Sequence, residues 1–311
     1  MESIKIIATS KYLPNNKVDN SFFDSKFNLD NDWITKRTGV INRFFTEDET
    51  IVDLAINVAK KITEKIDFDI QKIGNIIVAS TSSDRIMPGI SFEIQKALDI
   101  KKCMCLDISA GCSGFINAFD IARKNIVLEE TEYALVIGVE NISKFLDFED
   151  VNTSILLGDG AGAVLLGKSN IIKKYVSNIE SIGQDGDILT CHNGEKLYMN
   201  GKAIYKYAVS KVTENVENIL EKSDEKIENL KYIIPHQSNI RILESMSKKL
   251  NINEDKMYSN LDKVGNTFCA SIPIALNDIF DSLKDGDKLI LVRIWWWIKF
   301  RKYTFRSIVL S

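Results

Sequence analysis

The sequence has few residues of the kinds that bind metals or form disulfides. Only two histidines occur in 311 residues, His192 and His236. Among the five cysteines, Cys103 and Cys105 are separated by one residue rather than by the two typical of zinc sites. An odd number of cysteines without a secretory signal pattern also argues against a disulfide framework. We therefore expect no metal site, and thiol chemistry is the use that remains open for a cysteine.

Long apolar runs and a strong net charge are absent as well. No window reaches the ~18 apolar residues that a membrane-spanning helix needs. The net charge is −3 at pH 7, which argues against a general binder of nucleic acids, because phosphate backbones are held by clustered Lys and Arg. With 45% hydrophobic and 27% charged residues, the composition is typical of a soluble globular protein. We expect a cytoplasmic protein that binds neither nucleic acid nor a membrane.

Apolar runs bounded by turn residues alternate with helix-period segments, which predicts an α/β fold with buried strands. Helices are expected between these runs, for example where Leu54, Val58 and Ile62 keep one face apolar. The predicted strands are Asn75–Ser80, Ala134–Glu140, Gly162–Gly167 and Tyr232–His236.

Two segments share one form and indicate an internal repeat. Asp107–Arg123 and Lys263–Phe280 each read as a turn that leads into an apolar helix, and each is followed by an apolar strand. A duplicated unit would bring Cys112 and Asn266 to equivalent places that face each other. No low-complexity linker separates the halves, so we expect one compact body with an N-terminal half over 1–168 and a C-terminal half over 169–311.

Three residues at the ends of apolar runs are candidates for chemistry. Cys112 lies between glycines at the start of a predicted helix, where unpaired backbone N–H groups favour a thiolate, although a buried core cysteine fits the local sequence equally well. His236 follows a predicted strand, yet a structural histidine is the commoner case. Asn266 taken alone is a turn or cap residue. Together, the three form a much more specific pattern than any one of them.

Blocks along nearly the whole chain carry a resemblance to a known family. They are SKYLPNNKVDN (Ser10–Asn20), DWITKRTGV (Asp32–Val40), SAGCSGF (Ser109–Phe115), LLGDGAGAVLL (Leu156–Leu166), YMNGKAIYKYAV (Tyr198–Val209), PHQSNIRI (Pro235–Ile242) and GNTFCASIP (Gly265–Pro273). In this order they resemble β-ketoacyl-acyl-carrier-protein synthase III, the initiating condensing enzyme of fatty-acid synthesis in the thiolase superfamily. The resemblance implies a layered αβαβα fold of two duplicated halves with mixed five-stranded sheets.

The resemblance also implies a mechanism. Cys112 would take an acyl group from acyl-CoA, which is a substrate rather than a permanently bound cofactor. Malonyl-acyl carrier protein would then lose carbon dioxide, and His236 and Asn266 would donate hydrogen bonds to the enolate oxygen. A homodimer is expected, in which Met87 helps to close the acyl pocket.

Substrate contacts follow from the same resemblance. Val151 stands where many relatives carry an Arg that stacks on the adenine of CoA. Asp159 in GDGAGA is assigned a structural role. The expected CoA contacts are Trp33, Arg37 and Asn239, and the basic residues expected to dock the acyl carrier protein are Lys206, Arg241, Lys248 and Lys249.

The stretch LILVRIWWWIKFRKYTF (Leu289–Phe305) departs from the family. It holds three of the four tryptophans at Trp295–Trp297, where relatives carry a Phe-Gly-Gly-Gly loop. Tryptophan has the single codon TGG, and TGG repeats read one base later encode glycine. Ile294 read as ATT with the following T gives phenylalanine. We infer a frameshift near Arg293, which would leave Arg293–Ser311 displaced, poorly packed or low in order and would impair activity.

Two other functions remain open from the sequence. One is a related acyltransferase of secondary metabolism that uses the same cysteine. The other is an inactive paralogue that only binds acyl carriers.

Overall fold

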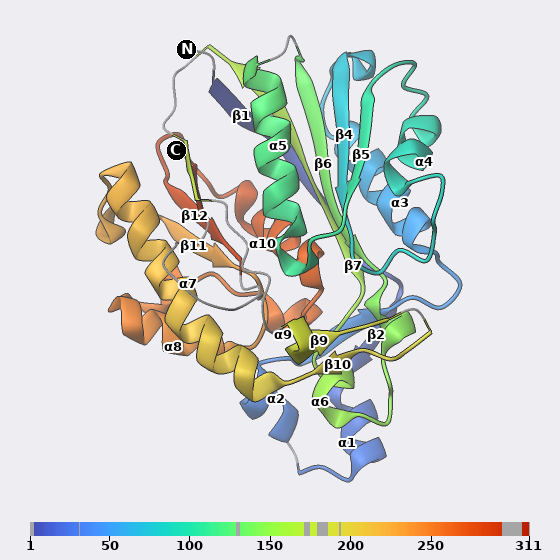
Figure 1. Cartoon of the computed structure of the whole chain (residues 1–311), viewed down its shortest axis with the longest axis vertical. Coiled ribbons are helices and arrows are strands. Elements are labelled where there is room, and N and C mark those ends of the chain that lie inside the picture. Colours follow the sequence, from blue (N-terminus) through green and yellow to red (C-terminus); the bar gives the residue numbers. More distant parts are fainter. Residues whose placement is uncertain are drawn as a thin grey trace.

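The computed structural model describes residues 3–30, 32–128, 131–170, 175–178, 186–192, 194–293 and 307–310. The first sheet has five strands in the order β1-β7-β6-β4-β5 (Figure 1). β4, β5 and β6 run parallel, whereas β7 is antiparallel to both β6 and β1, so the sheet is mixed as expected. Its strands are β1 (Ser3–Tyr12), β4 (Ile73–Ala79), β5 (Met104–Ile108), β6 (Tyr133–Glu140) and β7 (Gly160–Ser169).

The second sheet has four strands within the described part of the chain, where five were expected. Its order is β11-β12-β13-β8, with β11 parallel to β12 and the other pairs antiparallel. The strands are β11 (Tyr232–Pro235), β12 (Leu289–Val292), β13 (Ser307–Leu310) and β8 (Val176–Ser177).

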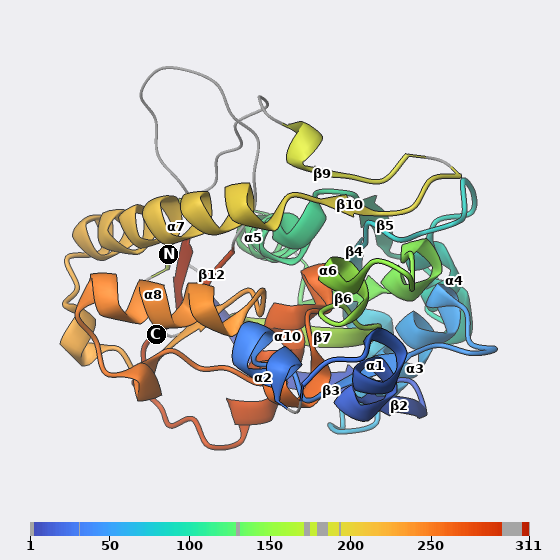
Figure 2. The same cartoon turned by 90° about the horizontal axis from the view of Figure 1, so that it is seen from below.

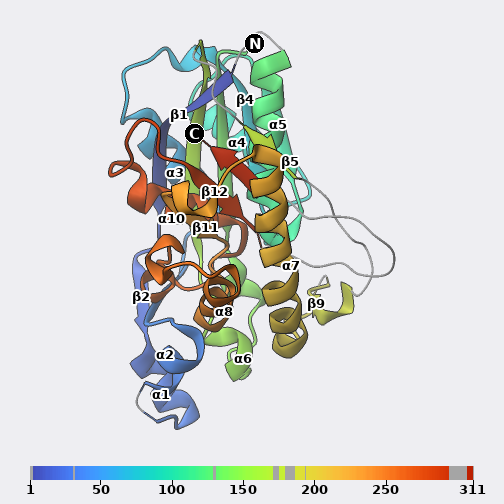
Figure 3. The same ribbon diagram turned by 90° about the vertical axis from the view of Figure 1, so that its left-hand side faces the viewer.

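Helices cover both sheets and also separate them, which gives five layers (Figures 1 and 3). α5 (Gly114–Leu128) and α10 (Ser271–Phe280) share one apolar cluster with residues of both sheets. α3 (Ile51–Thr63) and α4 (Ile90–Ala97) pack on the other face of the first sheet. α7 (Gly201–Ser223) and α8 (Ile240–Leu250) pack on the second. The predicted αβαβα layering is therefore confirmed.

Local sequence explains why these elements form. Along β6, Ala134 and Val136 face the central cluster while Leu135 and Ile137 face the outer one, because successive side chains of a strand point to opposite faces. α3 begins at a capping box in which Thr50 and Asp53 satisfy each other's backbone N–H groups. The four predicted strands and the predicted apolar helix face of Leu54, Val58 and Ile62 lie where the sequence pattern indicated.

Short elements gather beside the ends of the two sheets (Figure 2). Arg43 is fully buried among them, with its guanidinium 4.8 Å from the centre of the Phe23 ring, and it donates to the carbonyl of Ile155 at 2.6 Å. These elements are α1 (Asn20–Phe27), α2 (Trp33–Thr38), α6 (Val151–Ser154), α9 (Leu261–Val264), β2 (Asn16–Asp19), β3 (Asn42–Phe45), β9 (Leu189–Thr190) and β10 (Tyr198–Met199).

The predicted displacement of Arg293–Ser311 is wrong for the parts of the tail that the structure describes. Arg293 is buried, and β13 pairs with β12 from Leu289↔Leu310 to Val292↔Ser307. The apolar sequence of β12 offers an edge with unpaired backbone groups, which accounts for the pairing. Trp295–Trp297 and the rest of 294–306 lie outside the described residues.

None of the helices in the described ranges is long and apolar enough to cross a membrane.

Gly162 tests the packing of the second half on the first sheet. A Cβ at this position in β7 would lie 2.7 Å from the backbone N of Ile274 and 2.8 Å from the carbonyl carbon of Pro273. Backbone atoms cannot rotate away, so Gly162→Ala should lower the free energy of unfolding by about 1–3 kcal/mol. Gly201→Ala is the matched control, because no heavy atom lies within 4 Å of its Cβ position. Urea denaturation measures both, and equal stabilities for the two variants would contradict this packing.

Candidate active site

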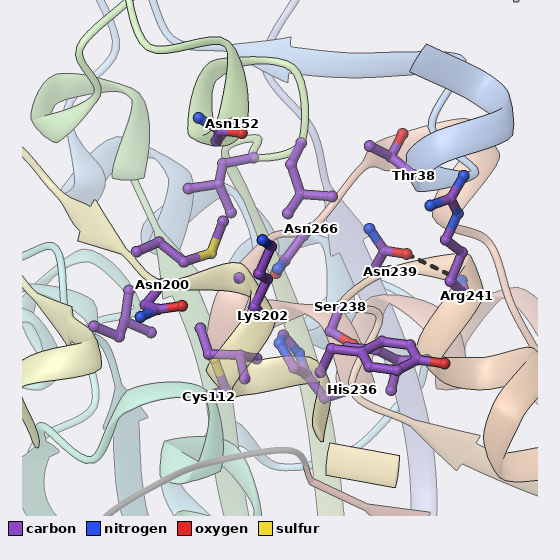
Figure 4. A pocket seen from close by; sticks show the side chains of 18 of the residues that line it. Thr38, Cys112, Asn152, Asn200, Lys202, His236, Ser238, Asn239, Arg241 and Asn266 are labelled. Atoms are coloured by element: carbon purple, nitrogen blue, oxygen red, sulfur yellow. Dashed lines mark hydrogen bonds between the residues drawn. The ribbon is translucent and has the colours of Figure 1, made fainter. Parts of the chain in front are cut away.

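A pocket of about 860 Å³ opens between the two halves of the fold, at the ends of β11 and of the two central helices. The sulfur of Cys112, the ring of His236 and the amide of Asn266 all line this pocket (Figure 4). The three side chains are buried, and they come from three segments far apart in the sequence. The structure therefore brings together the three residues singled out in the sequence.

Cys112 lies in the tight turn Gly111–Ser113 that leads directly into α5. Gly111 has φ +55°, a left-handed conformation that favours glycine. Burial raises the pKa of the Cys112 thiol well above its ordinary value, and the carboxylate of Glu140 adds to this effect. A backbone hydrogen bond and the charge of Arg293 lower the pKa by less. The backbone hydrogen bond favours the thiolate, as expected at a helix start, but desolvation outweighs it.

His236 follows β11 and is held by a serine that the sequence did not single out. The Oγ of Ser271 lies 2.6 Å from Nδ1 of His236, and it also accepts the backbone N–H of Gln237 at 3.3 Å. Within the described residues, Nδ1 of His236 is the acceptor available to the hydroxyl proton of Ser271. With the hydroxyl proton donated to Nδ1, the ring carries its own proton on Nε2.

Burial lowers the pKa of His236 to about 3, with the backbone of Phe268 acting weakly in the opposite direction. The ring is therefore neutral at physiological pH. Unfolding returns the ring to its ordinary pKa near 6.5, so the unfolded chain binds more protons between that pH and about 3. This residue thus makes the free energy of unfolding fall as the pH drops through that interval.

Asn266 is oriented by an aromatic residue in a strained conformation. Phe268 has φ +46°, and its backbone N–H donates to Oδ1 of Asn266 at 3.0 Å. Because the oxygen of the amide is engaged, its NH₂ group is the part left to donate into the pocket. The backbone of Asn266 is also fixed, since its N–H donates to the carbonyl of Leu156 at 2.9 Å.

Cations lie along the wall of the same pocket. Arg37, Asn239 and Arg241 contribute to the lining. Arg37 and Asn239 are two of the three residues predicted to contact CoA, and Arg241 was predicted to dock the carrier protein. Asn239 caps α8 by accepting the N–H of Arg241 at 3.0 Å and donates to the carbonyl of Arg37 at 3.3 Å. Lys202, at the start of α7, also lines the pocket but was not predicted. No sequence signal separated this residue from the other lysines of α7.

Other predicted residues lie away from the pocket lining. Trp33 is half-buried beneath the guanidinium of Arg37, which lies 4.9 Å from the ring centre. Val151 packs against an apolar cluster. Met87 is 79% exposed and does not line the pocket of its own chain. Asp159 is buried and accepts the N–H groups of Thr46 and Ser143, which fits its structural assignment.

The basic residues expected to dock a carrier protein share one exposed surface. Arg241, Lys248 and Lys249 lie on α8 and Lys206 lies on α7. The two helices lie side by side (Figure 2), joined by a 2.8 Å hydrogen bond between Tyr205 and Ser245.

Comparison with known proteins identifies the family. The model of 3-oxoacyl-[acyl-carrier-protein] synthase III matches residues 106–183, and the model of its C-terminal part matches residues 220–294. A β-ketoacyl-[acyl-carrier-protein] synthase III of Clostridium botulinum (strain Okra / Type B1) is 38% identical over 309 residues, with 94% of this chain and 95% of the relative covered. The chain belongs to the β-ketoacyl-[acyl-carrier-protein] synthase III family.

Solved structures of the family agree in fold. The 3-oxoacyl-[acyl-carrier-protein] synthase III of Aquifex aeolicus has a TM-score of 0.87 at 33% identity, and 99% of each chain is covered. The priming β-ketosynthase of the R1128 polyketide pathway has a TM-score of 0.84 at 25% identity, with 93% of this chain and 91% of that chain covered. The thiolase-like fold and the function of this family, the condensation that initiates fatty-acid synthesis, are thus confirmed as predicted.

The state of the His236 ring can be measured directly. ¹⁵N NMR of histidine-labelled protein should show a neutral ring with its proton on Nε2 at both pH 7 and pH 5, because burial disfavours the charged form. Ser271→Ala removes the donor to Nδ1 and should shift the ring toward a mixture of tautomers. His192→Gln assigns the signals, since the chain has only two histidines. A His236 ring that titrates near pH 6.5 would contradict this account.

Proposed function

We propose that this chain transfers an acyl group from acyl-CoA to Cys112 and condenses it with malonyl-acyl carrier protein. The observation that carries the proposal is the lining of one pocket by a thiol, a neutral imidazole and an oriented amide. Cys112 is the nucleophile, and His236 and Asn266 are the two hydrogen-bond donors. The 38% identity with a named synthase over most of the chain supports the same reaction.

The reaction divides into two half-reactions. In the first, the sulfur of Cys112 attacks the thioester carbonyl and the CoA thiolate leaves, taking up the proton that Cys112 releases. In the second, malonyl thioester loses carbon dioxide and leaves an enolate. The enolate carbon then attacks the acyl group and expels Cys112. Decarboxylation itself generates the carbon nucleophile, so no base is needed for this step.

The protonation state of the His236 ring suits the second half-reaction. A neutral ring with its proton on Nε2 donates a hydrogen bond to the enolate oxygen, as does the Asn266 amide. A donor aimed at developing charge is worth about 3–4 kcal/mol in comparable sites. Because the pKa of His236 is about 3, the ring stays in the donor form without carrying a charge.

Both substrates arrive on phosphorylated carriers, and exposed cations are available to meet them. Arg37 and Asn239 at the pocket are proposed CoA contacts, and Trp33 is retained as a proposed contact beside Arg37. The surface formed by Lys206, Arg241, Lys248 and Lys249 is proposed to dock the acidic carrier protein, since opposite charges steer such encounters.

A first experiment separates the two half-reactions. His236→Ala and Asn266→Ala should still gain one acyl group from acetyl-CoA, because neither donor acts in that step. Their decarboxylation of malonyl-acyl carrier protein should fall about a hundredfold or more. Cys112→Ala should show the reverse pattern, with no acylation and with decarboxylation retained. Intact-protein mass spectrometry follows the first step and carbon dioxide release the second. Acylation that persists in Cys112→Ala, or parental decarboxylation in both donor variants, would defeat the proposal.

The related polyketide priming enzyme keeps the second candidate function open, namely acyl transfer to an acceptor of secondary metabolism. A screen of carrier-protein and CoA acceptors against the acylated enzyme distinguishes the two functions.

We also propose that the chain forms a homodimer through the edge of its first sheet. β5 is the edge strand, and its backbone groups on that side have no partner strand within the described residues. Exposed apolar side chains lie at this edge. Met104 on β5 is 39% exposed, and Phe92 on α4 is 52% exposed. Ile86 and Met87 are also exposed, at 95% and 79%. Uncovered edges of this kind are a liability in a monomer.

Sedimentation equilibrium tests the dimer. The mass should be about twice the 35.2 kDa of one chain. Met104→Lys places a charge on the edge strand and should shift the protein toward the monomer. Leu128→Lys, at an 80% exposed position at the end of α5, should leave the dimer intact. A monomeric parent protein at micromolar concentration would exclude the assembly.

We also propose that the reading frame shifts near Arg293 and that the altered tail impairs the enzyme. The C-terminal family model stops matching at residue 294, immediately before Trp295–Trp297. The segment 294–311 also contains basic residues and no acidic ones, unlike the rest of the chain.

Restoring the loop tests this proposal. A version with Phe-Gly-Gly-Gly at 294–297 and the shifted-frame tail beyond it should condense faster by about 10²–10³, the usual effect of one oxyanion donor. The acylation rate at Cys112 on the same preparations is the control. Gene sequencing that finds the Trp codons in a frame shared with relatives, or a restored version that is no faster, would refute the frameshift.

A further inference from the structure

Glu140 is a fully buried acid that the proposed reaction does not use. It is the last residue of β6, and its two oxygens accept from the segment that follows β4. The backbone N–H groups of Thr81 and Ser82 donate at 3.1 and 3.0 Å, and the Thr81 hydroxyl donates at 2.9 Å. The hydroxyls of Ser82 and Ser80 also donate to it. Burial raises the pKa of Glu140, whereas the hydrogen bonds from Thr81 and Ser82 oppose that shift. Because backbone N–H groups can only donate, this set of partners favours the ionised carboxylate.

Cys269 connects this carboxylate to the turn of the nucleophile. Its thiol lies 3.1 Å from the carbonyl oxygen of Ala79, the last residue of β4, and 3.9 Å from the carbonyl oxygen of Val139, the residue before Glu140. A Cβ at Gly114 would lie 3.0 Å from the Cβ of Ala79 and 3.7 Å from the Cβ of Cys269. Gly114 follows Cys112 by two residues, at the start of α5. Glu140, Cys269 and the turn that holds Cys112 therefore lie close together in the packed interior.

Charged and titratable groups from four segments face the Cys112 thiol. Glu140 at the end of β6 is the negative one, and Arg293 after β12 is the positive one. Cys269 in the turn before α10 carries a thiol whose pKa burial raises, and His236 after β11 is neutral. Removal of the negative charge of Glu140 should therefore make the Cys112 thiol easier to ionise.

We propose that Glu140 is a positioning residue for the nucleophile, which fixes the Cys112 turn through Cys269 and places a negative charge beside it. The proposal rests on the assignment of Cys112 as the acyl carrier. A nearby negative charge opposes the thiolate but not the uncharged thioester. Glu140 thus keeps free Cys112 as a thiol, which reacts slowly with stray electrophiles.

The pH dependence of Cys112 alkylation tests this role. Iodoacetamide labelling is followed by peptide mass spectrometry, which separates Cys112 from the other four cysteines. Glu140→Gln keeps the shape but removes the charge, so the midpoint of Cys112 labelling should fall by roughly one pH unit or more, with about tenfold faster labelling below both midpoints. Ser82→Ala removes one hydrogen bond to the same carboxylate and keeps the charge, so its midpoint should match that of the parent. Glu140→Asp should also keep the parental midpoint.

A folded Glu140→Gln variant with the parental midpoint would overturn the proposal, because a purely structural acid changes stability and leaves this midpoint unmoved. A Ser82→Ala shift as large as that of Glu140→Gln would overturn it too. Circular dichroism checks folding, and Glu140→Asn replaces the Gln variant if that variant does not fold. The acylation assay with acetyl-CoA separates the two hypotheses. A parent protein that is never acylated defeats the proposed function and leaves the alkylation result standing. An unshifted midpoint in an acylated enzyme defeats only this proposal.

Discussion

The rest of the structure depends on the close approach of residues 269–274 to strands β6 and β7. At Gly138, a Cβ would lie 2.7 Å from the carbonyl oxygen of Cys269, and at Gly162 it would lie 2.7 Å from the backbone N of Ile274. Only glycine allows the turn before α10 to rest on the first sheet at this distance. That contact sets α10 beside α5 in the central layer, where both pack into one apolar cluster. The turns that precede these two helices consequently meet at a single pocket, with Cys112 on one and Asn266 near the other.

Burial at this meeting point sets the chemistry of the site. It holds the pKa of His236 at about 3, which suits a neutral hydrogen-bond donor, and it raises the pKa of Cys112, which does not suit a resting thiolate. The two effects have the same cause, since a charged form of either group would lose its hydration. Backbone hydrogen bonds and Arg293 offset only part of the cost at Cys112. Cys112 therefore rests as a thiol and not as a permanently ionised thiolate.

The sequence predicted the elements better than it predicted the environment of the site. Continuous apolar runs indicated β4, β6 and β7, and an apolar helix face indicated α3, because burial leaves a strong local signal. The repeat and the family blocks also predicted that Cys112, His236 and Asn266 would meet. Ser271 and Glu140 were missed, because their importance lies in contacts across elements that no local pattern records. The sequence also left open whether Cys112 is buried, and burial, which raises its pKa, depends on packing between distant segments.

A single-turnover chase tests the central claim most directly. The protein is acetylated with acetyl-CoA, freed of CoA by gel filtration and mixed with malonyl-acyl carrier protein, and the masses of both proteins are followed over time. The account predicts that each acetyl group lost from Cys112 appears as one acetoacetyl-acyl carrier protein with release of one carbon dioxide. An acetyl group that stays on the protein, or that leaves as acetate while the malonyl carrier is unchanged, would contradict it.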